Sequence, residues 1–322
     1  MLKVKIAFIL VGGTLAEFRF IDLFAGIGGM RIPFDEVNGE CAFSSEWDAH
    51  AAAVYLENYG EIPHGDISKI DESEIPDHDL LLAGFPCQPF SHAGHKKGFD
   101  DTRGTLFFDV ARIVNYSKPK IVLLENVRGL ISHDKGSTFG RIIEVLESLG
   151  YVVHWKILNA RDFGLPQNRP RVFVVSIRAD QEGALNYEFP KPICSATTVA
   201  DILELSVDPA LTISDRLWGG HQRRKRAHLE RGNGFGFSLV NGETATTRTL
   251  SARYYKDGSE ILVEQVGFNP RKLSIKEAAN LQGFPSWFIP SRSSAQAYKQ
   301  FGNSVSVPVV RAMRDSLTNF IT

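Results

Sequence analysis

The chain has 322 residues, 43% of them hydrophobic, which is enough for one large buried core with a smaller companion domain. Its formal net charge of -1 excludes a uniformly basic coat, so any contact with a nucleic acid must come from a local cluster of Lys and Arg. Three widely spaced cysteines, without a Cys-x-x-Cys pair or a His set of zinc spacing, predict a reducing cytosol and no metal.

The first seventeen residues carry an apolar run at 6–11 behind two lysines, which faintly resembles a signal peptide. The run is too short to span a bilayer. We interpret residues 1–17 as a cytosolic extension or an added strand, and no other stretch of the sequence has membrane length.

From residue 18 onward, short apolar runs alternate with segments of helical periodicity. The apolar runs predict buried strands at 19–24, 41–45, 80–83, 121–124 and 172–177. Helical spacing lies between them at 49–59, 106–115 and 139–149. This alternation predicts an α/β fold with a mostly parallel, doubly wound, Rossmann-like sheet and helices on both faces.

The composition changes after residue 180. Pro190 and Pro192 interrupt the chain, and a region rich in Gly, Arg, Thr and aromatic residues follows to about residue 269. We expect a catalytic domain at 18–189, a smaller domain at 190–285, and a segment at 286–322 that returns to the first domain.

The first predicted strand runs into a glycine-rich turn, in which backbone amides can approach a ligand. The turn contains Phe24, Ala25, Gly26, Gly28 and Gly29. The spacing is not the full dinucleotide fingerprint, and tight packing alone also explains such a turn.

Two later strand ends strengthen a nucleoside interpretation. Glu46 stands where nucleotide-binding sheets place an acid for ribose hydroxyls, and Trp47 can stack on adenine. Asp66, followed by Ile67, can accept a hydrogen bond from an exocyclic amine. Each residue alone has a plainer explanation, Trp47 as core and Asp66 as a helix cap, but three successive strand ends predict a nucleoside pocket.

A reactive group is predicted at the next strand end, where Gly84-Phe85-Pro86-Cys87-Gln88-Pro89-Phe90-Ser91 forms an irregular loop. A cysteine in such a loop can act as a nucleophile, whereas a lone buried cysteine is usually inert. Glu125 ends the following strand and can act as a general acid or base. Arg169 and Arg171 are two residues apart and therefore share one face of an extended segment.

These motifs, in this order, resemble the DNA cytosine-5 methyltransferases of bacterial restriction-modification systems. The resemblance runs from residue 18 to about 314 and includes Glu125-Asn126-Val127, the Gln-x-Arg-x-Arg segment and Gln300-Phe301-Gly302-Asn303-Ser304-Val305. It implies that Cys87 adds to C6 of a flipped cytosine while Glu125 protonates or hydrogen-bonds N3, so that C5 accepts a methyl group from S-adenosylmethionine. Arg169 and Arg171 are then expected to orient the base and the Cys87 loop.

The resemblance also implies a set of binding residues. The cofactor pocket is expected to add Pro86, Leu106 and Asn303 to the glycine turn and the acids named above. Residues 88–103 look like the family's loop that closes over the flipped base, with Gln88 and Ser91 expected to contact DNA.

The smaller domain is expected to read double-stranded DNA. The densest basic run includes Arg223, Arg224 and Lys225, for which we predict phosphate contacts. Arg248, Thr249 and Arg253 lie in Gly-loosened segments whose tips can reach base edges. The region resembles those of relatives with sites of the CC…GG type, although the exact site stays open.

Three other functions compete with this interpretation: an RNA cytosine-5 methyltransferase, a catalytically silent DNA-binding relative, and a dinucleotide-dependent oxidoreductase with a catalytic cysteine. The basic second domain argues against the RNA enzyme, and the intact Cys87 and Glu125 argue against the silent relative. The incomplete glycine fingerprint argues against the oxidoreductase. We further expect a monomer in the bacterial cytoplasm that is paired in function with a restriction endonuclease.

Overall fold

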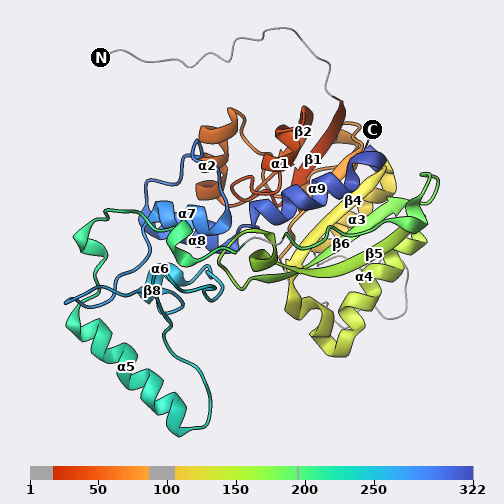
Figure 1. The fold of residues 1–322 in the computed structure, drawn as a ribbon. Helices are drawn as coiled ribbons and strands as arrows, with labels where there is room; N and C mark the ends of the chain where they lie inside the picture. The colour runs from red at the N-terminus through yellow and green to blue at the C-terminus, as the bar shows by residue number, and fades with distance from the viewer. Residues whose placement is uncertain (1–16, 87–105, 194–195, 322) are drawn as a thin grey trace, which may run out of the picture.

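The computed structural model describes residues 17–86, 106–193 and 196–321, and its centre is a six-stranded sheet (Figure 1). The strands are β1 (Phe18–Leu23), β2 (Gly39–Ser45), β3 (Leu80–Ala83), β4 (Ile121–Val127), β5 (Tyr151–Asn159) and β6 (Pro170–Arg178). Their order is β2-β1-β3-β4-β6-β5. The first four strands in this order run parallel, whereas β6 is antiparallel to both β4 and β5.

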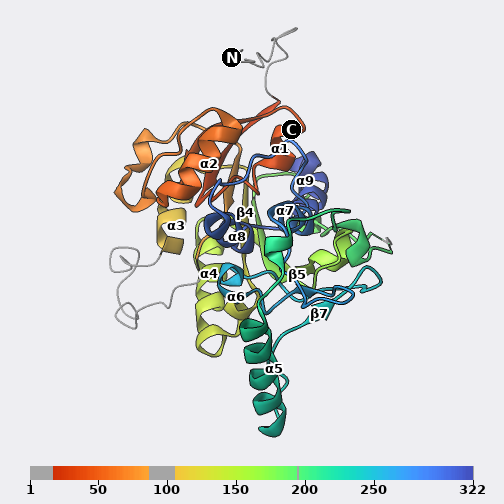
Figure 2. The same cartoon turned by 90° about the vertical axis from the view of Figure 1, so that its left-hand side faces the viewer.

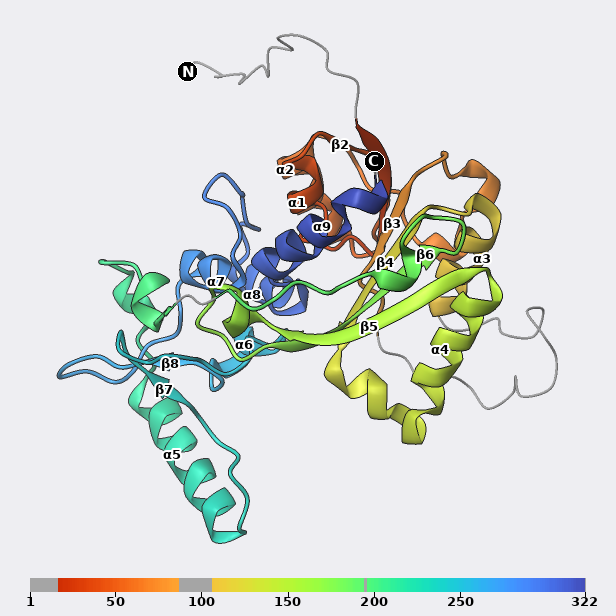
Figure 3. The same ribbon diagram turned by 45° about the vertical axis from the view of Figure 1, so that its right-hand side comes forward.

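Alternate strand residues pack against helices on the two faces of the sheet, because successive side chains of a strand point to opposite sides. On one face, Phe20 and Leu82 join a core with α1 (Ile32–Asp35) and α9 (Val307–Ile321). On the other, Ile21 and Leu81 pack with α3 (Leu106–Ser117) and α4 (Ser137–Ser148). Figure 3 shows α9 on the opposite side of the sheet from α3 and α4.

The predicted strands and helices are confirmed, with small differences at their ends. The helix expected at 49–59 is α2 (Ala49–Tyr59). One strand of the six-stranded sheet was missed: β5 is half exposed and carries His154, Trp155 and Lys156 in a row, so it lacks the apolar run of a buried strand. The strand expected at 121–124 continues to Val127, which places Glu125 inside β4 rather than after it.

The connections from β1 reverse direction across the sheet, since β2 lies on one side of β1 and β3 on the other. In open α/β sheets, ligands bind at the carboxyl ends of the strands where the strand order reverses. The position where the strand order reverses lies between β1 and β3. The glycine turn after β1 and the Gly84-Phe85-Pro86 segment after β3 flank it.

A second group of elements follows the sheet. It contains α5 (Asp215–Glu230), β7 (Leu239–Val240), α6 (Tyr254–Asp257), β8 (Leu262–Val263), α7 (Ile275–Gln282) and α8 (Ser294–Asn303). Its apolar core is continuous with α2, because Ala51 and Val54 pack together with Leu250, Leu281 and Phe301. The boundaries at 189/190 and 285/286 stay a prediction.

Helix α5 projects away from the rest of the chain, as Figures 1 and 2 both show. The sequence analysis gave the basic run at 221–231 no secondary structure, and in the structure residues 221–230 belong to α5 and Arg231 is its C-cap. None of the helices among residues 17–86, 106–193 and 196–321 is long and apolar enough to cross a membrane.

Candidate active site

The glycine turn after β1 has the backbone conformation that its residues suggest. Phe24 has φ 57°, Gly26 has φ 58° and Gly28 has φ 80°, so three of five consecutive residues are left-handed. A Cβ on Gly28 would lie 2.3 Å from the ring of Tyr59, and one on Gly29 would lie 2.5 Å from Ser304 Oγ. Glycine is therefore required here by close packing as well as by conformation.

Glu46, which directly follows the neighbouring strand β2, is hydrogen-bonded to this turn. Its Oε2 accepts a hydrogen bond from the amide of Gly26 at 2.8 Å, and its Oε1 accepts from the amide of Asp48 at 2.7 Å. Burial raises the pKa of Glu46, which these two amides partly offset. Trp47, directly after it, is 80% exposed and leaves its indole face free to receive a planar ring.

Asp66 caps the short helix η1 (Ile67–Lys69) by accepting from the amide of Ser68 at 3.1 Å and from its hydroxyl at 2.8 Å. The helix-cap explanation is thus correct as far as it goes. Hydrogen bonds from Ser68 lower the pKa of Asp66, so the half-buried carboxylate stays ionised as an acceptor, while Ile67 is buried beneath it.

Several contacts bring these segments together at one edge of the sheet. The amide of Glu46 donates to His64 O at 2.8 Å, which joins the β2 end to the Asp66 segment. Lys299 of α8 pairs with Asp48 at 2.9 Å, which brings α8, and at its end the exposed Asn303, to the same side. Leu106 begins α3 and is half-buried, and Pro86 is exposed at the end of its described segment.

The residues at this edge fit S-adenosylmethionine in their chemistry. The glycine turn, the exposed indole of Trp47 and two carboxylates at successive strand ends match an amino-acid moiety, an adenine ring, ribose hydroxyls and an exocyclic amine. The glycine turn, Glu46, the Asp66 segment and the end of α8 thus lie together at one edge of the sheet.

Glu125 of β4 pairs with Arg171 of β6, with 3.1 Å between Arg171 Nε and Glu125 Oε1. The pairing follows from topology: β6 is antiparallel to β4, so the start of β6 lies beside the carboxyl end of β4. Both side chains are largely buried, at 12% and 16% exposure. Burial raises the pKa of Glu125, and the charges of Arg171 and Arg169 act against this shift.

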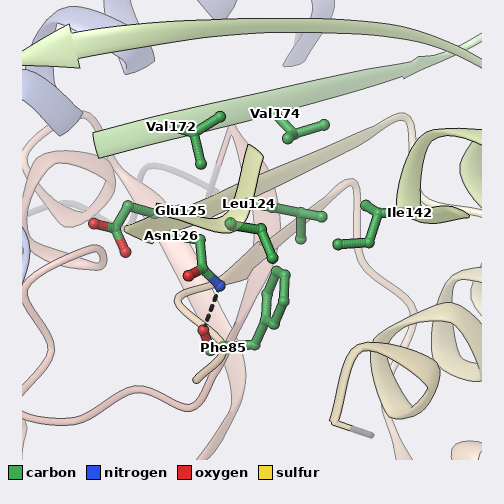
Figure 4. Close-up of a pocket in the computed structure, with 8 residues that line it drawn as sticks. Phe85, Leu124, Glu125, Asn126, Ile142, Val172 and Val174 are labelled. Atoms are coloured by element: carbon green, nitrogen blue, oxygen red, sulfur yellow. Dashed lines mark hydrogen bonds between the residues drawn. The ribbon is translucent and has the colours of Figure 1, made fainter. Parts of the chain in front are cut away.

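Asn126, next to Glu125, holds the segment that leads to Cys87. Its side-chain amide donates to the carbonyl of Phe85 at 2.8 Å, and its Oδ1 accepts from the amide of Val127. Figure 4 shows the amide turned toward Phe85 while the Glu125 carboxylate points away from the apolar side chains. Those side chains are Phe85, Leu124, Leu130, Ile142, Val172 and Val174.

Cys87, Gln88, Ser91 and the loop 88–103 lie outside the described residues. The structure does describe Gly84 and Phe85, which precede Cys87. A Cβ added to Gly84 would lie 3.9 Å from Glu125 Oε2, and the carbonyl of Phe85 accepts a hydrogen bond from Asn126. The chain therefore leaves β3 directly beside Glu125.

Arg169 is more deeply buried than Arg171 and contacts backbone carbonyls instead of Glu125. It is only 2% exposed, and its guanidinium donates to the carbonyls of Leu250 at 2.9 Å, Gly302 at 3.0 Å and Ser304. Burial and the nearby charge of Arg171 lower the pKa of Arg169 to about 9, while the charge of Glu125 acts against this shift, so the guanidinium stays charged at neutral pH. The two arginines therefore act on different partners, and Arg169 joins the start of β6 to two later segments.

The residues predicted to read DNA fall into two groups. Arg223 and Arg253 are exposed, whereas Arg224 pairs with Asp257 at 3.0 Å and Lys225 lies over the ring of Phe237 at 4.3 Å. Arg248 donates to Gly236 O at 2.6 Å, and Thr249 donates to Asn168 O at 2.6 Å. The hydroxyl of Thr249 is thus already used within the protein.

Three buried residues at or beside the site received no role from the sequence: Asn126, Gln167 and Asp22. Gln167 is fully buried, donates to Leu281 O at 2.9 Å, and accepts from the amide of Leu250 at 3.0 Å. Asp22 is 1% exposed, and its Oδ2 has no hydrogen-bond partner among residues 17–86, 106–193 and 196–321. A polar residue inside an otherwise apolar strand was the available signal for Asn126 and Asp22.

The sheet order, the glycine turn at its switch point and the buried Glu125 define a Rossmann-like transferase that binds a nucleoside cofactor. A family model described as C-5 cytosine-specific DNA methylase matches residues 18–319, and the chain belongs to this family. Its methyl donor is S-adenosylmethionine, and membership excludes the oxidoreductase alternative.

Proteins similar to this chain align with almost its whole length. Type II methyltransferase M.DsaV of Dactylococcopsis salina is 57% identical over 95% of this chain and 87% of the relative. Type II methyltransferase M.SsoII of Shigella sonnei is 56% identical over 94% of this chain and 80% of the relative. Among solved structures, S. pombe Dnmt2 methyltransferase has a TM-score of 0.75 at 21% identity and covers 93% of this chain and 98% of its own, which supports the fold.

Proposed function

We propose that this methyltransferase modifies one cytosine of a short duplex DNA sequence, with Cys87 as nucleophile and Glu125 as the acid at N3. The observation that carries the proposal is the environment of Glu125. A carboxyl group that is buried at a strand end and has a raised pKa keeps its proton more readily than an exposed one, which suits it to share that proton with a ring nitrogen.

The chemistry assigns one task to each group. Cys87 forms a bond from its sulfur to C6 of the flipped cytosine, and the electron pair of the C5–C6 double bond is pushed toward C5 as Glu125 gives or shares its proton with N3. S-adenosylmethionine supplies an electrophilic methyl group. Once the methyl group has been transferred, leaving S-adenosylhomocysteine, water takes the C5 proton, N3 returns its proton to Glu125, and departure of the Cys87 thiolate restores the aromatic ring. Arg171 holds the Glu125 carboxyl in place and opposes too large a rise of its pKa.

Arg169 is proposed to act as a positioning residue. Its three backbone acceptors are Leu250, which precedes α6, Gly302 in the last turn of α8, and Ser304 just after that helix, so Arg169 fixes the start of β6 and with it Arg171. Asn126 supports Cys87 in the same way through the Phe85 carbonyl.

For the cofactor, we propose that Trp47 stacks on adenine, Glu46 accepts from the ribose and Asp66 accepts from the exocyclic amine. The exposure of Trp47 and the ionised state of Asp66 support these roles. Phe24, Ala25, Gly26, Gly28 and Gly29 would surround the amino-acid part, with Ile67, Pro86, Leu106 and Asn303 completing the pocket.

We propose that Arg248 and Arg253 read base edges, Thr249 holds the reading segment against Asn168, and the target is of the CC…GG type. Relatives named Type II methyltransferases support a functional pairing with a restriction endonuclease. One catalytic site and one reading region in one chain favour a monomer, and the bacterial relatives favour the cytoplasm.

The first test is bisulfite sequencing of DNA from a host that expresses the gene, which reveals the modified cytosine directly. In vitro, the purified protein should transfer labelled methyl to that duplex and form a covalent adduct when 5-fluorocytosine replaces the target. Full transfer by Cys87→Ser would contradict the nucleophile assignment, and modification of transfer RNA instead of DNA would contradict the substrate.

A further inference from the structure

Helix α5 has one face turned to the smaller domain. On that face Trp218 contacts the ring of Phe237 with 4.7 Å between ring centroids, and His221 is bonded to the carbonyl of Asp257 at 3.2 Å. Arg224 and Lys225 are held on this side as well, by Asp257 and by Phe237. Two of the three cations that the sequence singled out on this helix are therefore engaged within the protein.

The opposite face of α5 carries Arg216, Arg223 and Arg226. Positions seven and three apart lie on one side of an α-helix, so these three guanidinium groups form a row. All three are exposed, and within the described part of the chain none has a carboxylate at ion-pair distance. Residues 215–231 hold six Lys and Arg against two acids, in a chain whose net charge is -1.

Gly219 and Gly220 lie within this row, between Arg216 and Arg223. Two glycines in an exposed helix interior cost roughly 1 kcal/mol each relative to alanine. Neither has a positive φ, and the nearest atom to a Cβ on Gly219 is the flexible Nη1 of Arg223, at 3.3 Å. Conformation and internal packing therefore do not require glycine here, whereas a partner backbone that lay close against the helix would.

The position of α5 relative to the catalytic edge suggests which partner approaches. In Figure 1, α5 and the segment η5 (Arg128–Gly136), which follows directly after Glu125 and Asn126, project from the same side of the molecule. With 16 residues, α5 is about 24 Å long, or roughly seven base pairs of duplex.

We propose that the outward face of α5, formed by Arg216, Gly219, Gly220, Arg223 and Arg226, binds the phosphate backbone of duplex DNA that flanks the target sequence. The inference rests on the proposed function, since the duplex is the substrate of methyl transfer. The row of unpaired guanidinium groups supplies the charge, and the glycine pair lets a strand lie against the helix. This face adds affinity without reading sequence.

The test compares Arg216→Gln/Arg223→Gln/Arg226→Gln with a control of equal charge change, Lys191→Gln/Lys276→Gln/Arg292→Gln, in which all three residues are exposed elsewhere. Dissociation constants are measured by fluorescence anisotropy over a series of salt concentrations, on a long duplex and on one trimmed to about one helical turn around the target. Methyl transfer is measured in single turnover at saturating DNA.

For the α5 variant, we expect binding to the long duplex to weaken about tenfold or more, and the slope of log K against log salt to shrink by about 2 to 3. Binding of the α5 variant to the trimmed duplex should weaken much less than its binding to the long duplex. The control should bind like the wild type. An unchanged dissociation constant and slope for the α5 variant would overturn the proposal, even with methyl transfer intact. Absent methyl transfer by the wild type would instead contradict the proposed function.

The glycine pair has a separate test in Gly219→Ala/Gly220→Ala. Alanine should raise the melting temperature because it favours the helix, yet the added Cβ atoms should weaken binding to the long duplex severalfold. A higher melting temperature with wild-type affinity would overturn the role of the glycines.

Discussion

Arg171 Nε lies 3.1 Å from Glu125 Oε1, and this pair joins two antiparallel strands at the catalytic edge of the sheet. The two groups have opposite effects on the proton of Glu125. Burial favours the neutral carboxyl, whereas the guanidinium favours the carboxylate. The balance leaves the pKa of Glu125 raised, which suits an acid.

We expect Glu125→Gln to lower kcat by about 10²- to 10⁴-fold with little change in the affinity for S-adenosylmethionine, because glutamine can hydrogen-bond N3 but cannot give it a proton. Single-turnover methyl transfer and cofactor titration measure the two quantities. A variant with kcat within a few-fold of the wild type would contradict the acid role.

Removal of Arg171 should change the pH profile. If protonated Glu125 is the active form, kcat falls as the pH rises through its pKa. Arg171→Gln removes a charge that lowers this pKa, so the fall in kcat should move to higher pH, together with a loss in maximal rate. Lys156→Gln, which removes an exposed cation from β5, is the control and should leave the profile unchanged. A profile that moves to lower pH would refute the coupling.

Asn126→Ala should lower kcat by roughly tenfold or more through loss of the Phe85 contact, which fixes the chain two residues before Cys87. The same change leaves a buried carbonyl without a partner and should cost about 1 to 3 kcal/mol of unfolding free energy. The rate at which the covalent adduct with 5-fluorocytosine DNA forms measures the reactivity of Cys87 directly. If adduct formation kept its normal rate, Asn126 would have only a structural role.

Asp22→Asn should stabilise the protein in a pH-dependent way. Burial raises the pKa of Asp22 to about 8, so the folded protein holds a proton there that the unfolded chain releases above the ordinary aspartate pKa. The wild type therefore loses stability as the pH rises from about 4 to about 8, and asparagine carries no such penalty. Thermal melting should show a gain for Asp22→Asn at pH 8 that shrinks toward pH 4. A gain independent of pH would contradict the titration.

The sequence predicted the buried parallel strands because they are continuous apolar runs, and it predicted the motif residues at their ends. It could not predict β5, whose exposed face breaks the apolar pattern, nor the antiparallel direction of β6. That direction decides the site, since only an antiparallel β6 brings Arg171 to Glu125. The sequence also could not predict that Arg169 binds backbone carbonyls while Arg171 pairs with Glu125, because their spacing alone predicts the same surroundings for both.

The carbonyls of Gly302 and Ser304 that hold Arg169, and the side chains of α9 that cover β1, come from the last part of the chain. During synthesis, the ribosome therefore releases the first strand and its glycine turn long before the residues that cover them exist. A nascent chain that stops before residue 302 exposes the apolar face of its sheet and leaves the Arg169 guanidinium without two of its acceptors. The Arg169 contacts and the cover of β1 therefore form only after the residues that follow Gly302 have been made.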